Sequence, residues 1–162
     1  MIKQIINIEE LEYQGFPGGH PEHVKAKYDG SVMGQAAARI GAKKLGYNIT
    51  KLPPGKRAFP FHSHRVNEEM FFVVEGEGEI RIGDKTYAIK KGDFIACPPG
   101  GPETAHQIVN SSEAELIYIG VSTKEDPEIA EYPDSKKFGV MSMDGFRFLG
   151  KADQSLGYWD GE

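Results

Sequence analysis

The chain has 162 residues and a formal net charge of −5, from 24 acidic and 19 basic side chains. This length suits one compact domain with a core of its own. Because the sequence carries no basic patch that could neutralise several phosphates, we do not expect it to bind nucleic acid.

The compartment is predicted from the cysteine count and from the apolar runs. No apolar run approaches the about 18 residues of a membrane span, and the first stretch is interrupted by Asn7, Glu9 and Glu10, unlike a signal peptide. The single cysteine, Cys97, excludes an intrachain disulfide and fits a reducing compartment. We therefore expect a cytoplasmic protein without a membrane partner.

Residues 1–44 form an N-terminal extension in which the patterns are weak. Residues 5–13 fit either a short strand or a helical turn, and residues 15–23 are loop-like by composition. Residues 32–44 carry a helical pattern that Gly34 and Gly41 interrupt. An arm strand and a short helix are the elements expected here.

Residues 45–122 have a sequence pattern typical of a β-barrel. Alternating side chains predict a strand over 45–52, an apolar run predicts one over 69–76, and residues 79–89 read as a hairpin with Gly83 and Asp84 at its turn. Further strands are expected within 91–101 and at 106–110 and 114–121. The 20 glycines and 10 prolines separate these strands, which indicates an antiparallel sandwich or barrel.

Residues 123–162 form a C-terminal extension. Residues 124–139 are loop-like, residues 146–149 fit one more strand, and the last stretch holds the only tryptophan, Trp159. Such a flank either packs on the outside of the barrel or crosses to a partner subunit. Exposed aromatic side chains within it would favour the second arrangement.

The histidines are the candidate metal ligands. The chain has five of them: His20, His23, His62, His64 and His106. Residues two apart on a strand point to the same face, so His62 and His64 could reach one ion, and His106 begins a later strand. Three neutral imidazoles and a carboxylate would suit one divalent Mn, Fe, Ni, Co or Zn ion and leave positions open for a substrate. The alternative is a pair of exposed or structurally satisfied histidines.

Two stretches resemble the two motifs of the cupin superfamily. Residues 55–76 contain a glycine, H-x-H, a glutamate and a closing glycine, and the second stretch has Gly92, Pro98, Gly100, His106 and Asn110. Six residues separate Gly55 from His62 and five separate Gly100 from His106, so both spacings are longer than in the family pattern. The resemblance implies an all-β jelly-roll barrel (a double-stranded β-helix) with N- and C-terminal extensions, one bound metal and a homodimer.

The adjacent Glu68 and Glu69 are not distinguished by strand alternation, because both faces of their strand are apolar. The motif places its ligand seven positions before the closing Gly76, which selects Glu69. The resemblance thus implies the metal ligands His62, His64, Glu69 and His106. Glu68 is then a candidate base for moving a proton of the substrate.

Three further residues are candidates for substrate binding. Arg57 and Arg65 flank the histidine strand and either form a solvated rim or hold an anionic group of the substrate. Phe71 is expected to line the barrel, where it could touch the substrate.

Four residues receive structural interpretations. His20 and His23 are expected to be exposed loop residues, and Cys97 a small buried hydrophobe. Asn110 is expected to hold a turn or to support the site without binding the ion.

Three functions follow from the resemblance, in order of preference. The first is a metal-dependent enzyme acting on a small polar, carbohydrate-like or sugar-phosphate substrate, in the manner of the cupin phosphomannose and phosphoglucose isomerases. The second is a mononuclear iron dioxygenase or a manganese decarboxylase. The third is a non-catalytic, small-molecule-binding or regulatory cupin.

Overall fold

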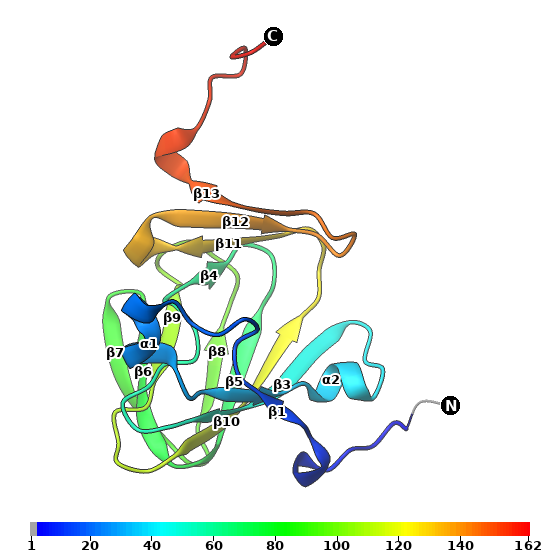
Figure 1. Ribbon diagram of the computed structural model, residues 1–162, viewed down its shortest axis with the longest axis vertical. Coiled ribbons are helices and arrows are strands. Elements are labelled where there is room, and N and C mark those ends of the chain that lie inside the picture. Colours follow the sequence, from blue (N-terminus) through cyan, green and yellow to red (C-terminus); the bar gives the residue numbers. More distant parts are fainter. Residues whose placement is uncertain (1–2) are drawn as a thin grey trace.

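A computed structural model of the chain describes residues 3–162 (Figure 1). Its strands, in chain order, are β1 (Tyr13–Gln14), β2 (Val32–Gly34), β3 (Leu45–Leu52), β4 (Ser63–His64), β5 (Glu69–Glu75), β6 (Glu77–Ile82), β7 (Lys85–Lys90), β8 (Phe94–Cys97), β9 (His106–Val109), β10 (Leu116–Thr123), β11 (Glu128–Tyr132), β12 (Lys137–Met141) and β13 (Arg147–Lys151). The helices are α1 (Glu22–Tyr28), α2 (Ala36–Arg39) and three short 3-10 turns at Ile8–Glu10, Pro133–Ser135 and Ala152–Gln154.

The strands form antiparallel sheets that enclose one core. A six-stranded sheet has the order β1-β2-β3-β10-β5-β8, and a three-stranded sheet has the order β7-β6-β9. Apolar side chains from both sheets pack between them, and this core cluster comprises Leu52, Phe71, Val73, Ile80, Ile89, Ile95, Cys97, Ile108, Leu116 and Tyr118. The structure is thus the all-β jelly-roll barrel expected from the sequence. The predicted hairpin is confirmed, since Ile82 pairs with Lys85 across Gly83 and Asp84.

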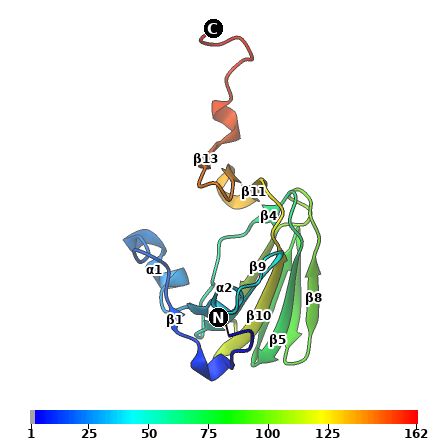
Figure 2. The same cartoon turned by 90° about the vertical axis from the view of Figure 1, so that its right-hand side faces the viewer.

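The N-terminal extension adds two strands and two helices to the barrel. Strands β1 and β2 continue the large sheet beyond β3, and Figure 2 shows α1 on the side of the barrel away from β8. Helix α1 is tied to the barrel by the backbone bond from Arg57 to the carbonyl of Lys27 and by the ammonium of Lys56, which donates to the carbonyl of Ala26. The loop predicted over residues 15–23 is wrong at its last two residues, because α1 begins at Glu22.

No helix within residues 3–162 is long and apolar enough to span a membrane.

The C-terminal extension contributes β11, β12 and β13 to a separate four-stranded sheet, β13-β12-β11-β4, in which β4 comes from the barrel region. The loop predicted over 124–139 is wrong, because β11 and β12 lie there, whereas the strand predicted at 146–149 is confirmed by β13. Strand β11 pairs with the barrel through Ala130 opposite His64 and Glu131 opposite Ser63. Beyond β13, the last residues extend away from the body of the molecule (Figures 1 and 2).

Candidate metal centre

The three motif histidines come from two short segments that pair with each other. The backbone amide of His62 donates to the carbonyl of His106 over 3.2 Å, and the reverse bond measures 2.7 Å. Residues paired in this way project their side chains to the same face of a sheet. Accordingly, the ring centroid of His62 lies 4.9 Å from that of His106 and 5.0 Å from that of His64.

The loop between Gly100 and His106 is closed by its own bonds, so its extra length does not displace His106. The amide of Gly100 donates to the carbonyl of His64 over 2.8 Å, and the amide of Thr104 donates to the carbonyl of Gly101 over 3.1 Å. The additional residues are taken up in this turn, and the chain returns in register to pair His106 with His62.

The imidazoles converge on one oxygen of Glu69. Its Oε2 lies 2.9 Å from Nε2 of His106, 3.3 Å from Nε2 of His64 and 3.9 Å from Nε2 of His62. Ligand atoms of His62, His64 and Glu69 lie within 4.8 Å of one another, which is close enough for them to hold a single ion. His106 joins the same cluster through Glu69. The structure therefore brings together all four residues that the sequence indicated as metal ligands.

The second nitrogen of each ring faces an acceptor, which suits metal binding through Nε2. Nδ1 of His62 lies 2.8 Å from the carbonyl of Pro60, and Nδ1 of His106 lies 3.3 Å from the carbonyl of Thr104. Nδ1 of His64 lies 3.5 Å from Oε2 of Glu128, an ion-pair distance without the geometry of a hydrogen bond. A proton on Nδ1 leaves the lone pair of Nε2 free for an ion. The donor set therefore fits a divalent transition metal.

Burial and neighbouring charges set the protonation of this cluster. Burial, with His106 close by, lowers the pKa of His62 to about 4, so this imidazole is neutral near pH 7. Burial also lowers the pKa of His64, but Glu69 and Glu128 outweigh it and the net shift is upward. Burial opposes ionisation of Glu69, yet the bonds from His106 and His64 hold its pKa well below the usual range. An ionised carboxylate at the centre of the cluster is what a cation requires.

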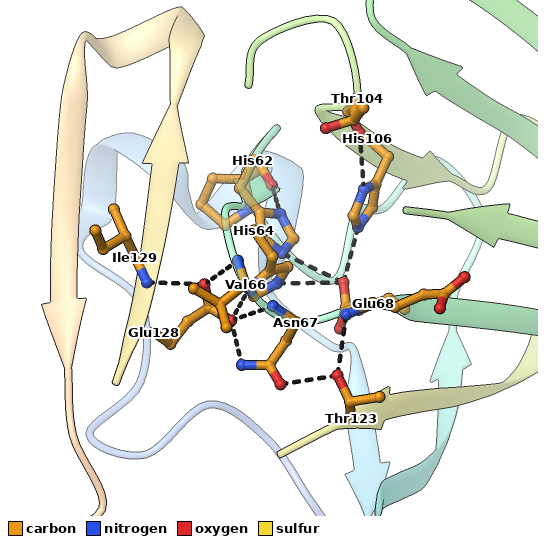
Figure 3. Close-up of polar contacts among 12 residues, drawn as sticks. His62, His64, Val66, Asn67, Glu68, Thr104, His106, Thr123, Glu128 and Ile129 are labelled. Carbon is orange, nitrogen blue, oxygen red and sulfur yellow. Dashed lines mark hydrogen bonds and ion pairs between the residues drawn. The ribbon is translucent and has the colours of Figure 1, made fainter. Parts of the chain in front are cut away.

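Of the two adjacent glutamates, the structure turns only Glu69 toward the imidazoles. Glu69, Phe71 and Val73 occupy alternate positions of β5 on its inner face. Glu68 is exposed, and its backbone amide donates to the hydroxyl of Thr123 on β10 (Figure 3). Within residues 3–162, no ion pair or hydrogen bond joins the carboxylate of Glu68 to the cluster.

Phe71 lies in the core rather than at an open surface. Its ring centroid is 5.5 Å from that of His106 and 5.8 Å from that of Tyr118. Phe71 thus supports His106 from the barrel side, and Tyr118 in turn supports Phe71.

Within residues 3–162, no hydrogen bond or ion pair joins either candidate arginine to the cluster. Nε of Arg65 is 2.6 Å from Oε1 of Glu131, so this guanidinium is paired at the surface. Arg57 is half-buried, and its backbone pairs with Val109 of β9 and with Lys27 of α1.

A cavity of about 380 Å³ is walled largely by the N-terminal extension, and none of the four predicted ligands lines it. Phe59 lines it, and the ring centroid of Phe59 lies 6.3 Å from that of His62. Its walls include Val32, Met33 and Thr50, and it also contains an ion pair, in which Nη2 of Arg39 is 3.2 Å from Oε1 of Glu12. The cavity therefore combines an apolar wall with a paired cation, and Phe59 is the lining residue that contacts the ring of His62.

Two residues of β11 contact the predicted ligands and were not singled out from the sequence. Oε2 of the buried Glu128 faces His64, and the ring of Tyr132 stacks on His62 with centroids 6.1 Å apart and planes inclined by 22°. Both residues lie in residues 124–139, which were predicted to be a loop. No sequence pattern indicated them, because the inward positions of this strand include a carboxylate and a tyrosine rather than an apolar alternation.

The structural interpretations are confirmed for two of four residues. Asn110 is fully buried and holds a turn, since its amide donates to the carbonyls of Leu52 and Ala114. Cys97 is buried in the core. His23 is exposed but lies in α1, not in a loop, and the expectation of an exposed His20 is wrong, because its ring packs on Phe16 with centroids 5.2 Å apart.

Comparison with known proteins identifies the protein family of the barrel. Residues 48–122 match the cupin domain. The chain is 32% identical over 84 residues to an uncharacterized protein of Methanocaldococcus jannaschii, and 31% identical over 90 residues to a gentisate 1,2-dioxygenase of Streptomyces. These matches span 49% and 55% of this chain, but only 64% and 24% of the two relatives.

The solved structures extend the likeness beyond the barrel. A sugar phosphate isomerase of the cupin superfamily from Silicibacter pomeroyi superimposes with a TM-score of 0.82 at 25% identity. That superposition covers 96% of this chain and 98% of the other, so it includes both extensions. The jelly-roll fold, the two motifs and the family match together show that residues 48–122 form a domain of the cupin superfamily.

Proposed function

We propose that the protein is a metal-dependent enzyme acting on a small polar substrate of the sugar-phosphate kind, with an isomerase type of reaction. The observation that carries this proposal is the cavity lined by Phe59, whose ring lies next to that of His62. Its walls come largely from the N-terminal extension, and the extension is shared with the structure of the sugar phosphate isomerase. By contrast, the dioxygenase match involves only 55% of this chain.

The residues that would hold the ion are His62, His64, Glu69 and His106. A divalent metal at this point would polarise a carbonyl of the substrate and the hydroxyl next to it. The proton on the carbon that bears this hydroxyl would then be easier to remove. The carbonyls of Pro60 and Thr104 accept from the outer nitrogens of His62 and His106, which orients both rings. Because Glu69 and the rings keep some exposure toward solvent, a substrate can reach them.

The substrate would lie in the cavity, with its anionic group at Arg39. Arg39 is the guanidinium of the cavity wall, whereas Arg65 is paired with Glu131 outside it. A phosphate could replace the carboxylate of Glu12 on Arg39 and bind it through two parallel hydrogen bonds.

The test compares metals and substrates in one assay. Metal-free protein would be reloaded separately with Mn, Fe, Ni, Co or Zn and incubated with aldose and ketose phosphates in D2O, with NMR following interconversion and deuterium uptake. We expect turnover with at least one metal, and Arg39→Ala should raise KM for the phosphorylated sugar about 10-fold or more with a smaller change in kcat. Turnover that is insensitive to Arg39→Ala would contradict the assignment of the phosphate to this residue.

A dioxygenase is the second candidate, and the 31% identity to the gentisate 1,2-dioxygenase favours it. Oxygen uptake by the iron-loaded protein with gentisate would establish a dioxygenase activity and would contradict the isomerase proposal. Metal and ligand binding without turnover in either assay would leave the non-catalytic, small-molecule-binding role. A manganese decarboxylase would be recognised by release of CO2 from small dicarboxylates.

A further inference from the structure

The inner face of β11 lies against two of the predicted metal ligands. Glu128, Ala130 and Tyr132 alternate along this strand and therefore share a face. Ala130 pairs with His64 in the sheet, Glu128 faces the ring of His64, and Tyr132 stacks on the ring of His62. The C-terminal extension thus covers the outer side of both histidines, although it lies outside the matched cupin domain at residues 48–122.

Glu128 is a buried carboxylate held in one orientation by backbone donors. Its Oε1 accepts from the amide of Val66 over 3.3 Å and from that of Ile129 over 2.8 Å. Its Oε2 accepts from the amide of Asn67 over 3.0 Å and from the side-chain amide of the same residue. Figure 3 shows Glu128 between β11 and the loop that follows His64. A carboxylate fixed in this way cannot turn away from its neighbours.

His64 is the neighbour that still needs an acceptor. Its Nδ1 is buried and has no hydrogen bond, and Oε2 of Glu128 lies 3.5 Å from it. A buried N–H without a partner is unfavourable, so a small shift of the ring that closes this contact is favourable. With the proton on Nδ1 directed at Glu128, Nε2 carries the lone pair and points toward Glu69.

We propose that Glu128 is the positioning residue that fixes the tautomer and orientation of His64 for metal binding, which makes β11 a part of the metal centre. This inference rests on the metal-binding half of the proposed function and is independent of the substrate. Carboxylates that orient a metal-bound histidine typically contribute about 10- to 100-fold in metal affinity.

Two variants separate this role from a merely structural one. Glu128→Gln removes the charge that faces His64, while Glu131→Gln removes an equal charge from the same strand, where the partner is Arg65 at the surface. A third variant, Thr123→Val, removes the hydroxyl that accepts from the amide of Glu68 and donates to Asn67 in the same loop. It leaves every donor to Glu128 in place. All three would be titrated with Zn or Co against a chelator of known affinity.

We expect Glu128→Gln to weaken metal binding about 10- to 100-fold. Glu131→Gln and Thr123→Val should bind within about twofold of the original chain, a margin small beside that effect. Wild-type affinity in Glu128→Gln, or an equal loss in Thr123→Val, would overturn the proposal. A measurement that needs no variant is the tautomer of His64 in the metal-free chain, read from imidazole 15N shifts at a pH at which the ring is neutral. The proton should reside on Nδ1, and a proton on Nε2 would overturn the proposal. This result does not depend on whether the chain binds metal tightly or on whether a substrate is found.

Discussion

The adjacent Glu68 and Glu69 show how much a single residue position can decide in this barrel. Glu69 is directed at three imidazoles, while Glu68 is exposed and interacts with Thr123 only through its backbone amide. The choice between them could be made from the sequence only through the motif spacing to Gly76, since apolar residues line both faces of the strand. Glu128 could not be found in the same way. Its role depends on a carboxylate of the C-terminal extension packing against a loop more than sixty positions earlier, and no local pattern encodes that contact.

The two glutamates form a matched pair of substitutions. Glu69→Gln should weaken metal binding by more than the about 10- to 100-fold typical of residues that only orient a ligand, because it removes the charged oxygen at the centre of the cluster. Glu68→Gln should leave the affinity unchanged. Chelator competition measures both. Equal losses in the two variants would mean that Glu69 holds no ion.

The thiol of Cys97 provides a second test at the residue scale. Burial, with Glu69 nearby, raises the pKa of this thiol to about 12. At pH 8 the group is therefore almost entirely in the unreactive thiol form, and burial also blocks access to it. We expect a disulfide reagent to leave the native chain unmodified at pH 8 and to react once per chain after unfolding in denaturant. Rapid modification of the native chain would contradict the buried position.

At the scale of the elements, the sequence predicted the barrel strands better than the strands of the extensions. The strands around β5, β6 and β7 contribute apolar side chains to one core, so their pattern is visible in the sequence. In β11 and β12 most positions are only half-buried, and the inner face of β11 carries Glu128 and Tyr132. A strand whose inward residues are polar has no apolar alternation, which is why residues 124–139 resembled a loop.

The turn between β5 and β6 depends on Gly76, the closing glycine of the first motif. Its φ is +82°, and a Cβ at this position would lie 2.5 Å from the carbonyl oxygen of Glu115. Gly76→Ala should therefore destabilise the fold by roughly 3 kcal/mol, the sum of a left-handed backbone and a backbone clash.

Gly55 is the matched control for this turn. It has a φ of +73°, but nothing lies within 4 Å of an added Cβ. Gly55→Ala should cost only the about 1–2 kcal/mol of the left-handed conformation. Chemical denaturation compares the two variants, and equal losses of stability would show that the contact with Glu115 is not limiting.

At the scale of the whole molecule, the exposed apolar side chains gather in the C-terminal extension. Phe146, Phe148 and Leu149 are exposed on or beside β13, which is the edge of its sheet. In the segment that follows, Tyr158 is 86% exposed and Trp159 is 77% exposed, and this segment extends away from the barrel (Figure 2). An unpaired edge strand followed by bare aromatic rings is a surface that a second copy of the chain could cover.

We therefore expect a homodimer in which this extension contacts the partner subunit. A closed dimer repeats the same contact twice, so removing one short segment from each chain removes both contacts at once. Ending the chain after Gln154 should shift the mass measured by sedimentation toward that of a monomer, while the barrel keeps its metal affinity, because the predicted ligands and β11 all precede this point. The single tryptophan gives an independent reading: the emission of Trp159 should move to longer wavelength as the full chain is diluted and the dimer dissociates. Identical masses for the full and shortened chains would show that the aromatic segment does not join the subunits.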